Sequence, residues 1–222
     1  MLYQESELGF WFESAHVYAF FGKACATRLL IEKEFPEIQF MKVQQTHSDI
    51  IVHANTNSQT ADAHWTQVKK TALLISTADC MPILIHNTVT QTVAAVHAGW
   101  KGVCNQITVK SLKALSTRQS TGLDFETWIG PHIMPSSFEV KNDVLNQLLA
   151  SSYKADKTEH FTNGDSIHVD LKSIVLSQIS ASIGSGFKCL ELNLDTLTAA
   201  YLHSYRRDKQ NSGRNLSFIY LK

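Results

Sequence analysis

The sequence lacks an excess of charge of either sign, and this absence limits the partners to be expected. Among its 222 residues, 20 are Lys or Arg and 20 are Asp or Glu, so the formal net charge at pH 7 is zero. Non-specific binding to DNA or RNA depends on surplus basic residues that neutralise backbone phosphates. We therefore expect no nucleic acid among the partners of this protein.

Long apolar runs are lacking as well. A helix that spans a bilayer needs about 20 consecutive apolar residues, and no stretch of this sequence approaches that length. Residues 1–14 (MLYQESELGFWFES) contain neither the basic segment nor the apolar segment of a secretory signal. These absences predict that the protein is soluble, has no membrane partner and resides in the cytoplasm.

Cysteine is scarce and is not grouped. The four cysteines form no C-x-x-C pair, so the pattern indicates neither a disulfide framework nor a compact zinc motif. We expect all four thiols to be reduced. Three of them, Cys25, Cys104 and Cys189, are interpreted as thiols of the hydrophobic core.

The composition and the alternation of short segments predict the fold class. Apolar residues make up 44% of the chain and charged residues 18%, as in globular proteins. The length, without repeats or linkers, predicts one domain over residues 1–222. Apolar, β-rich runs alternate with amphipathic segments, which predicts an α/β (mixed α+β) fold with mixed β-sheets flanked by helices. Since no exposed apolar stripe stands out, we expect a monomer. The predicted strands cover residues 38–43, 50–53, 71–76, 82–86, 92–97 and 215–221, and the predicted helices cover residues 22–35 and 103–115 and begin at caps Asn142 and Asp170.

Three side chains that can bind a metal stand where predicted strands meet loops, namely His47, Cys80 and His97. Strand ends hold side chains in fixed positions, as metal ligands require. Two imidazoles and one thiolate suit zinc, and three protein ligands leave a fourth coordination position open, as in catalytic zinc sites. Spacing alone favours a core cysteine and two ordinary hydrogen-bonded histidines, because separations of 33 and 17 residues match no compact zinc motif.

The sequence around these residues resembles the signature blocks of one protein family. The main blocks are QTHS at 45–48, TADCMP at 77–82 and VHAGWKG at 96–102. The further blocks are IGP at 129–131, FEV at 138–140, SYRRD at 204–208 and GRN at 213–215. Together, over residues 44–221, they resemble the YfiH-like family, whose members are named as laccase-domain, polyphenol oxidase or purine nucleoside phosphorylase proteins.

The resemblance implies a site, a metal and a reaction. It implies that His47, Cys80 and His97 are catalytic metal ligands and that the metal is zinc, with copper as the alternative. The implied reaction converts a purine nucleoside (adenosine, inosine, guanosine or methylthioadenosine) and phosphate to the base and ribose 1-phosphate. Adenosine deamination is the implied companion activity. The expected partners are therefore a purine nucleoside and phosphate.

Four charged residues near the blocks are further candidates. Asp79 is a candidate general acid or base, or a partner of a metal-bound histidine, with a structural cap as the alternative. On an extended segment Arg206 and Arg207 point in opposite directions, so one is expected to bind phosphate while the other pairs with Asp208. A solvated turn is the alternative for this pair. Lys101 stands where relatives commonly carry Arg, and it is expected to contact an anion as a point charge.

Other interpretations remain open. His132 is interpreted as a surface histidine of a turn, with a polar group near the site as the alternative. A copper polyphenol oxidase needs additional histidines in H-x-H pairs, and the sequence contains none. A hydrolase with Cys80 as nucleophile and His97 as base, or a factor that edits peptidoglycan precursors, is a further alternative. In a last alternative, zinc only stabilises a binding module.

Overall fold

The computed structural model describes residues 2–55, 59–153, 159–184 and 186–222. These residues form two six-stranded mixed sheets, a three-stranded sheet and short helices. The mixed α/β fold predicted from the sequence is therefore confirmed.

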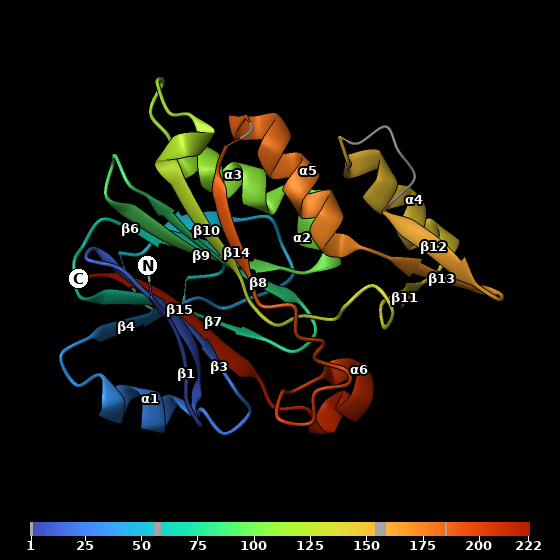
Figure 1. Ribbon diagram of the computed structural model, residues 1–222, viewed down its shortest axis with the longest axis horizontal. Coiled ribbons are helices and arrows are strands. Elements are labelled where there is room, and N and C mark those ends of the chain that lie inside the picture. Colours follow the sequence, from blue (N-terminus) through green and yellow to red (C-terminus); the bar gives the residue numbers. More distant parts are fainter. Residues whose placement is uncertain (1, 56–58, 154–158, 185) are drawn as a thin grey trace.

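The first sheet combines both ends of the chain (Figure 1). In spatial order it contains β1 (Leu2–Glu5), β2 (Gly9–Glu13), β3 (Val17–Gly22), β15 (Asn215–Leu221), β7 (Thr71–Thr77) and β4 (Gln39–Lys42). The last strand, β15, lies between β3 and β7 and pairs antiparallel with both. The segment just before β15 is thereby brought to the edge of the sheet where β7 ends.

The second sheet contains the most buried strands of the chain. In spatial order it contains β14 (Lys188–Glu191), β10 (Phe125–Ile129), β8 (Met81–Asn87), β9 (Thr92–Ala98), β6 (Ala63–Thr66) and β5 (Ile51–His53). Side chains alternate along β8: Ile83 and Ile85 face the helices, whereas Leu84 packs with residues of the first sheet. Because both faces of β8 and β9 are covered, these two central strands are buried at every position and mostly apolar.

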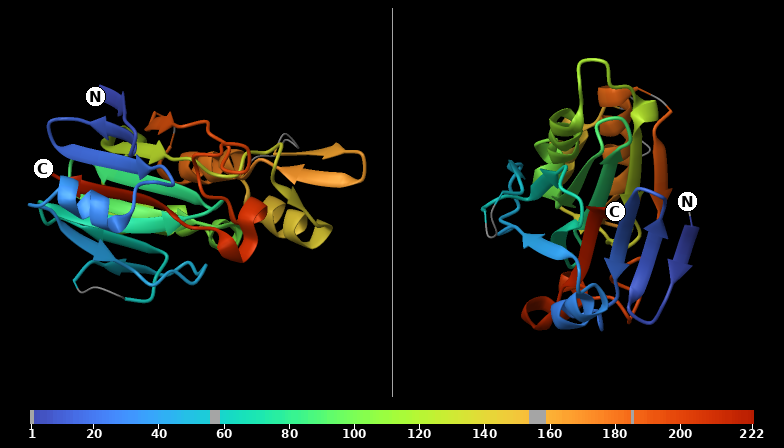
Figure 2. Two further views of the ribbon diagram at one scale, coloured as in Figure 1. Left: turned by 90° about the horizontal axis from the view of Figure 1, so that it is seen from below. Right: turned by 90° about the vertical axis from the view of Figure 1, so that its left-hand side faces the viewer.

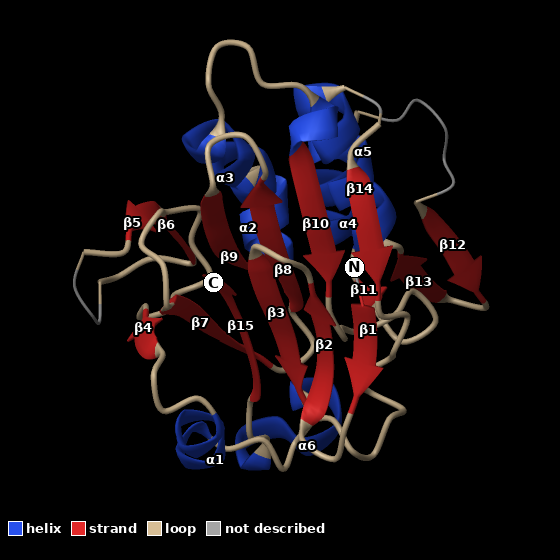
Figure 3. Cartoon of the chain, turned by 60° about the vertical axis from the view of Figure 1, so that its left-hand side comes forward, coloured by secondary structure: helices blue, strands red, loops and turns tan. Residues whose placement is uncertain are grey.

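The helices at residues 100–104, 107–115 and 171–183 cover the outer face of the second sheet (Figure 3), whereas the helix at residues 28–34 packs against the first sheet. The helices are α1 (Arg28–Glu34), α2 (Trp100–Cys104), α3 (Ile107–Leu115), α4 (Asn142–Ser151), α5 (Leu171–Ile183) and α6 (Tyr205–Asp208), with 3-10 helices at Gly122–Asp124 and Lys209–Asn211. The small third sheet contains β11 (Glu139–Val140), β13 (Ser166–Val169) and β12 (His160–Asn163). With α4 it projects at one end of the molecule, away from both termini (Figure 2). No helix in the described ranges is long and apolar enough to cross a membrane.

The predicted strands are all present, but the predicted helices differ in their limits. The helix expected at 103–115 is wrong in one respect: it is broken into α2 and α3 because Gln106 adopts a left-handed backbone, with φ 59°. The expected helix at 22–35 begins only after Thr27, whose side chain caps it. Asn142 is the first helical residue rather than the cap. Asp170 does cap α5, since its side chain accepts a hydrogen bond from the Ser173 amide.

The thiols interpreted as core residues differ from one another. Cys104 and Cys189 are partly buried and pack against the core between the second sheet and the helices. Cys25 is exposed, so its interpretation as a core thiol is wrong. It lies in the turn that precedes α1, and its Sγ donates to the carbonyl oxygen of Glu7 at 3.2 Å. All four cysteines are free thiols.

Candidate metal centre

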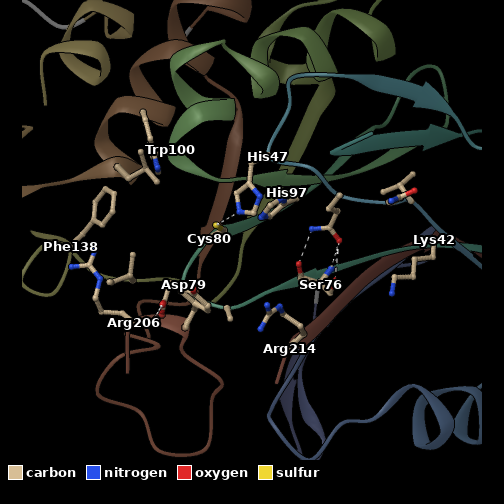
Figure 4. Close-up of a pocket in the computed structure, with 17 residues that line it drawn as sticks. Lys42, His47, Ser76, Asp79, Cys80, His97, Trp100, Phe138, Arg206 and Arg214 are labelled. Atoms are coloured by element: carbon tan, nitrogen blue, oxygen red, sulfur yellow. Dashed lines mark hydrogen bonds between the residues drawn. The ribbon is translucent and has the colours of Figure 1, made fainter. Parts of the chain in front are cut away.

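The side chains of His47, Cys80 and His97 converge at one point between the two sheets (Figure 4). Their ligand atoms all lie within 4.8 Å of one another. The Cys80 Sγ is 3.8 Å from the His47 Nε2, and the two imidazole ring centroids are 4.9 Å apart. A tetrahedral zinc ion with typical bond lengths separates a nitrogen and a sulfur ligand by about 3.6 Å. The donor set and its spacing therefore fit zinc.

The pairing of β8 with β9 explains how two of these residues meet. In this antiparallel pair Met81 faces Ala98 and Pro82 faces His97. Cys80 directly precedes the first residue of β8, so it lies beside the end of β9. Two residues that are distant in sequence are thus held together by the register of one hairpin.

A buried carboxylate, Asp62, connects the third candidate ligand, His47, to His97 through hydrogen bonds. Asp62 is fully buried and its Oδ1 accepts hydrogen bonds from the His97 Nδ1 at 2.7 Å and from the His47 amide at 3.0 Å. Its Oδ2 accepts from the amides of Thr46 at 3.1 Å and Ser48 at 2.6 Å, and from the Ser48 hydroxyl at 2.6 Å. Because Nδ1 of His97 is used, its Nε2 is the atom left to bind a metal.

The same contacts set the protonation of the centre. Burial alone would raise the pKa of Asp62, but hydrogen bonds from His97 and Ser48 outweigh it and lower this pKa. Burial also raises the pKa of Cys80, whereas hydrogen bonds and positive charge at His47 and His97 bring it down to about 7. The thiolate, which is the form that binds metals, is therefore available near neutral pH.

The backbone around the ligands is unusual at three positions. His47 and Asp79 both have positive φ angles, 59° and 79°, which non-glycine residues rarely adopt. At Gly99 a Cβ atom would lie 3.1 Å from the His47 ring and 3.2 Å from the Cys80 Sγ. A larger residue here would therefore require the His47 and Cys80 side chains to shift by a few tenths of an ångström.

A cavity of about 680 Å³ opens over the three ligands. Its described lining contains three permanent cations, Lys42, Arg206 and Arg214, and one acidic residue, Asp79. The cavity is therefore suited to a negatively charged ligand that reaches the metal centre.

Two of the four charged candidates line this cavity. Asp79 accepts a hydrogen bond from the Thr196 hydroxyl at 2.7 Å on one carboxylate oxygen, and the other accepts from the backbone amide of Arg206. The Arg206 guanidinium donates twice, at 3.2 Å, to the carbonyl oxygen of Glu139, and lies 6.0 Å from the ring centroid of Phe138. Both side chains thus connect separate segments of the cavity wall through hydrogen bonds.

The other two candidates are not among the lining residues. Residues 205–208 form the helical turn α6, so the extended segment expected there is wrong. Arg207 pairs with Asp208 at 2.8 Å, as expected for one of the two arginines, and its Nη2 donates to the carbonyl oxygen of Leu202 at 2.7 Å. Lys101 is exposed on α2, and its Nζ is 5.7 Å from the Trp100 ring centroid.

His132 is buried, with 1% of its surface exposed, so its interpretation as a surface residue is wrong. The segment after β10 is covered by residues 192–196, and the backbone of His132 bonds to Leu194 and Thr196. Its Nδ1 donates to the carbonyl oxygen of Gly130 at 2.9 Å. It does not line the cavity.

Several residues of the site had no role predicted from the sequence. Asp62 belongs to the ADA tripeptide at 61–63, Arg214 to the GRN block and Trp100 to the VHAGWKG block. Their place in these sequence segments could have indicated that these residues belong to the site. Lys42 had none, since it is an ordinary exposed position of a short strand.

Comparisons with known proteins agree with this class of structure, a two-sheet α/β protein. A sequence model of the family described as "Multi-copper polyphenol oxidoreductase laccase" matches residues 23–222. A purine nucleoside phosphorylase of Clostridium acetobutylicum is 32% identical over 183 residues, which cover 81% of this chain and 76% of that protein. The chain belongs to this family, the YfiH-like family that its sequence blocks predicted.

Two further relatives have YfiH-type names. The purine nucleoside phosphorylase YfiH of Shigella flexneri is 32% identical over 169 residues, covering 74% of this chain and 65% of that protein. The match thus spans slightly less than two thirds of that relative's length. The crystal structure of YlmD from Geobacillus stearothermophilus has a TM-score of 0.86 at 20% identity and covers 99% of this chain and 98% of its own. This structural likeness concerns the fold.

Proposed function

We propose that this protein is a zinc-dependent purine nucleoside phosphorylase with adenosine deaminase as a companion activity. The observation that carries the proposal is a three-ligand centre, His47, Cys80 and His97, at the floor of a cavity lined by cations. Three ligands leave a coordination position for a substrate atom. Relatives at 32% identity bear the name purine nucleoside phosphorylase.

The reaction takes a purine nucleoside and phosphate to the free base and ribose 1-phosphate. A phosphate oxygen forms a bond to C1′ of the ribose, while the C1′–N9 bond breaks and its electrons leave with the purine, which is then protonated. Positive charge develops at C1′ and negative charge arrives with phosphate, so cationic side chains that fix the phosphate lower the barrier. Bound zinc supplies a Lewis acid beside the reacting groups.

The residues of the centre have separate roles in this proposal. His47, Cys80 and His97 hold the metal, and Asp62 keeps the His97 imidazole in the required tautomer and orientation. Asp79 positions the backbone of Arg206 through its carboxylate. A multicopper oxidase needs several metal clusters, and within the described ranges His47, Cys80 and His97 are the one cluster of this kind.

A thiol hydrolase is the second candidate, because the His97–Asp62 hydrogen bond beside Cys80 has the arrangement of a nucleophile, a base and an orienting acid. The two candidates differ over the state of the thiol. In the phosphorylase Cys80 is occupied by zinc, whereas in the hydrolase it must be free to form a covalent intermediate.

The test combines metal analysis with product analysis. Elemental analysis of the purified protein is expected to find about one zinc per chain, and incubation with adenosine is expected to release adenine only when phosphate is present. Inosine formation reports the deaminase activity. The variants His47→Ala and Cys80→Ala are expected to lose both zinc and products. Adenine release that survives the loss of zinc, or that needs no phosphate, contradicts the phosphorylase and favours the hydrolase.

A further inference from the structure

We propose that Asn163 is a site of spontaneous covalent modification, at which the side-chain amide is lost as the protein ages and isoaspartate forms in the third sheet. The reaction needs an asparagine whose carboxamide carbon is accessible to the backbone nitrogen of the next residue. In this sequence asparagine is followed by glycine once, at Asn163 and Gly164. The inference concerns a part of the chain outside the metal centre and does not rest on the proposed activity.

The pair stands at the tip of the hairpin formed by β12 and β13, in the projecting part of the molecule (Figure 2). Asn163 ends β12 and pairs with Ser166, the first residue of β13, so Gly164 and Asp165 form a two-residue turn. β12 is the last strand of the third sheet. Because the Asn163–Ser166 pair ends the ladder of this edge strand, it opens more easily than a pair inside a sheet.

The turn leaves the Asn163 side chain open to attack. Gly164 has a φ of 60°, and a Cβ atom built on it would meet no heavy atom within 4 Å. A positive φ at the first turn residue but not at the second, Asp165, is the pattern of a type II′ turn, which glycine adopts without strain. Residues 163–165 are all exposed. Within the described part of the chain, neither the Asn163 carboxamide nor the Gly164 amide has a hydrogen-bond partner.

The reaction begins with ring closure within the chain. The Gly164 nitrogen attacks the Asn163 Cγ and forms an N–Cγ bond, while the Cγ–Nδ2 bond breaks and Nδ2 leaves as ammonia with the Gly164 amide proton. The product is a five-membered cyclic imide. Water then adds to one of the two imide carbonyl carbons, the C–N bond at that carbon breaks, and the nitrogen regains a proton. Opening at Cγ gives aspartate, whereas opening at the backbone carbonyl carbon gives isoaspartate, in which the backbone passes through Cβ and Cγ.

Isoaspartate at position 163 changes the hairpin itself. It inserts one carbon atom into the backbone of β12 and converts the former backbone carbonyl into a carboxylate, so the pair with Ser166 is lost. The Ser166 hydroxyl donates to the Glu139 Oε1 at 2.8 Å, and β13 pairs with β11, which begins at Glu139. The Glu139 carbonyl oxygen accepts from the Arg206 guanidinium at the cavity wall. The modification therefore loosens β12, one strand away from the strand that contacts this wall.

Peptide mass spectrometry after storage at neutral pH and physiological temperature, in water enriched in heavy oxygen, tests the site. The Asn163 peptide is expected to gain one heavy oxygen, and fragmentation that distinguishes the two isomers is expected to report isoaspartate. Asn105 and Asn211 are internal controls, because both are exposed but are followed by residues with side chains, Gln106 and Ser212. Conversion at Asn163 is expected to be at least about tenfold faster than at either control, since glycine has no Cβ to hinder ring closure. Asn163→Gln is expected to prevent conversion, because its longer side chain would have to close a six-membered ring.

Hydrogen exchange tests the effect on the hairpin. In the aged protein the amides of β12 and of Ser166 are expected to exchange about 2- to 10-fold faster than in fresh protein, as for the loss of one hydrogen bond. Asn163→Asp is the matched control: it adds the same charge with an unaltered backbone and is expected to keep the exchange rates of fresh wild type. Conversion at Asn163 that is no faster than at Asn105 and Asn211 overturns the modification site. Equal exchange before and after conversion overturns the loosening of β12.

Discussion

Replacement of Asp62 by Asn changes the support of the metal centre while all three ligands stay in place. The side chain keeps its size but loses its charge, and one oxygen becomes an amide nitrogen. The Asp62 Oδ1 accepts from His97 and His47, and Oδ2 accepts from the amides of Thr46 and Ser48 and the Ser48 hydroxyl. Whichever oxygen is replaced, an NH₂ group faces donors that it cannot accept from.

The size of the effect follows from these contacts. Loss of a carboxylate that orients a metal-bound histidine costs about 10- to 100-fold in metal affinity. Each buried donor left without an acceptor costs about 1–3 kcal/mol. If the amide nitrogen faces the side of His97 and His47, two donors are left, and the free energy of unfolding is expected to fall by about 2–6 kcal/mol.

The assay is competition for zinc against a chelator of known affinity, together with urea denaturation. Asp62→Asn is expected to release zinc at about 10- to 100-fold lower chelator concentration than wild type. Asp165→Asn, in the exposed turn between β12 and β13, is the matched control and is expected to keep the wild-type zinc affinity. Equal zinc affinity in Asp62→Asn and wild type would refute the proposal that this carboxylate supports the metal centre.

Three further predictions concern packing, pH and thiol reactivity. Gly99→Ala is expected to lower zinc affinity about tenfold, because the added Cβ would lie 3.1 Å from the His47 ring and 3.2 Å from the Cys80 Sγ. The far-UV circular dichroism is expected to stay unchanged. A zinc affinity equal to that of wild type would contradict this prediction. Burial lowers the pKa of His64 to about 3, against about 6.5 when unfolded. Between these two pKa values His64 binds a proton in the unfolded chain but not in the folded chain. The free energy of unfolding therefore falls as the pH falls. His64→Leu is expected to reduce this slope by about 1.4 kcal/mol per pH unit, measured by denaturation at pH 6 and 5, and equal slopes would contradict it. In the zinc-loaded protein iodoacetamide is expected to modify the exposed Cys25 and to spare Cys80, as mass spectrometry of the peptides would report, whereas after zinc removal Cys80 is expected to react as well. Labelling of Cys80 at equal rates with and without zinc would contradict this.

Six strands of the fold could be predicted because their signal is local, whereas others, such as β1, β2 and β3, were not predicted. Residues 71–76 and 92–97 are continuous apolar runs, and each becomes a strand buried on both faces. The break between α2 and α3 could not be predicted in the same way, since a left-handed Gln106 is set by tertiary packing rather than by a preference of glutamine. The burial of His132 likewise depends on the distant segment 192–196.

The three candidate metal ligands, Asp79 and Arg206 could be selected from their sequence blocks, but the contacts that complete the site could not be predicted. Asp62 binds the His97 imidazole across 35 residues of sequence, and no periodicity reports such a contact. Arg214 lies beyond the end of β7 only because β15, at the end of the chain, lies between β3 and β7. Lys101 was a candidate by charge and position in its block, yet the backbone of α2 directs it to the surface.

Zinc K-edge X-ray absorption on the purified protein tests the central claim most directly. The metal centre proposed here predicts one sulfur ligand at about 2.3 Å and two imidazole nitrogens at about 2.0–2.1 Å, with one further light atom. In Cys80→Ser, the sulfur contribution is expected to disappear from the spectrum of the zinc that remains bound. A wild-type spectrum without sulfur, or a spectrum unchanged in Cys80→Ser, would contradict a centre built from His47, Cys80 and His97.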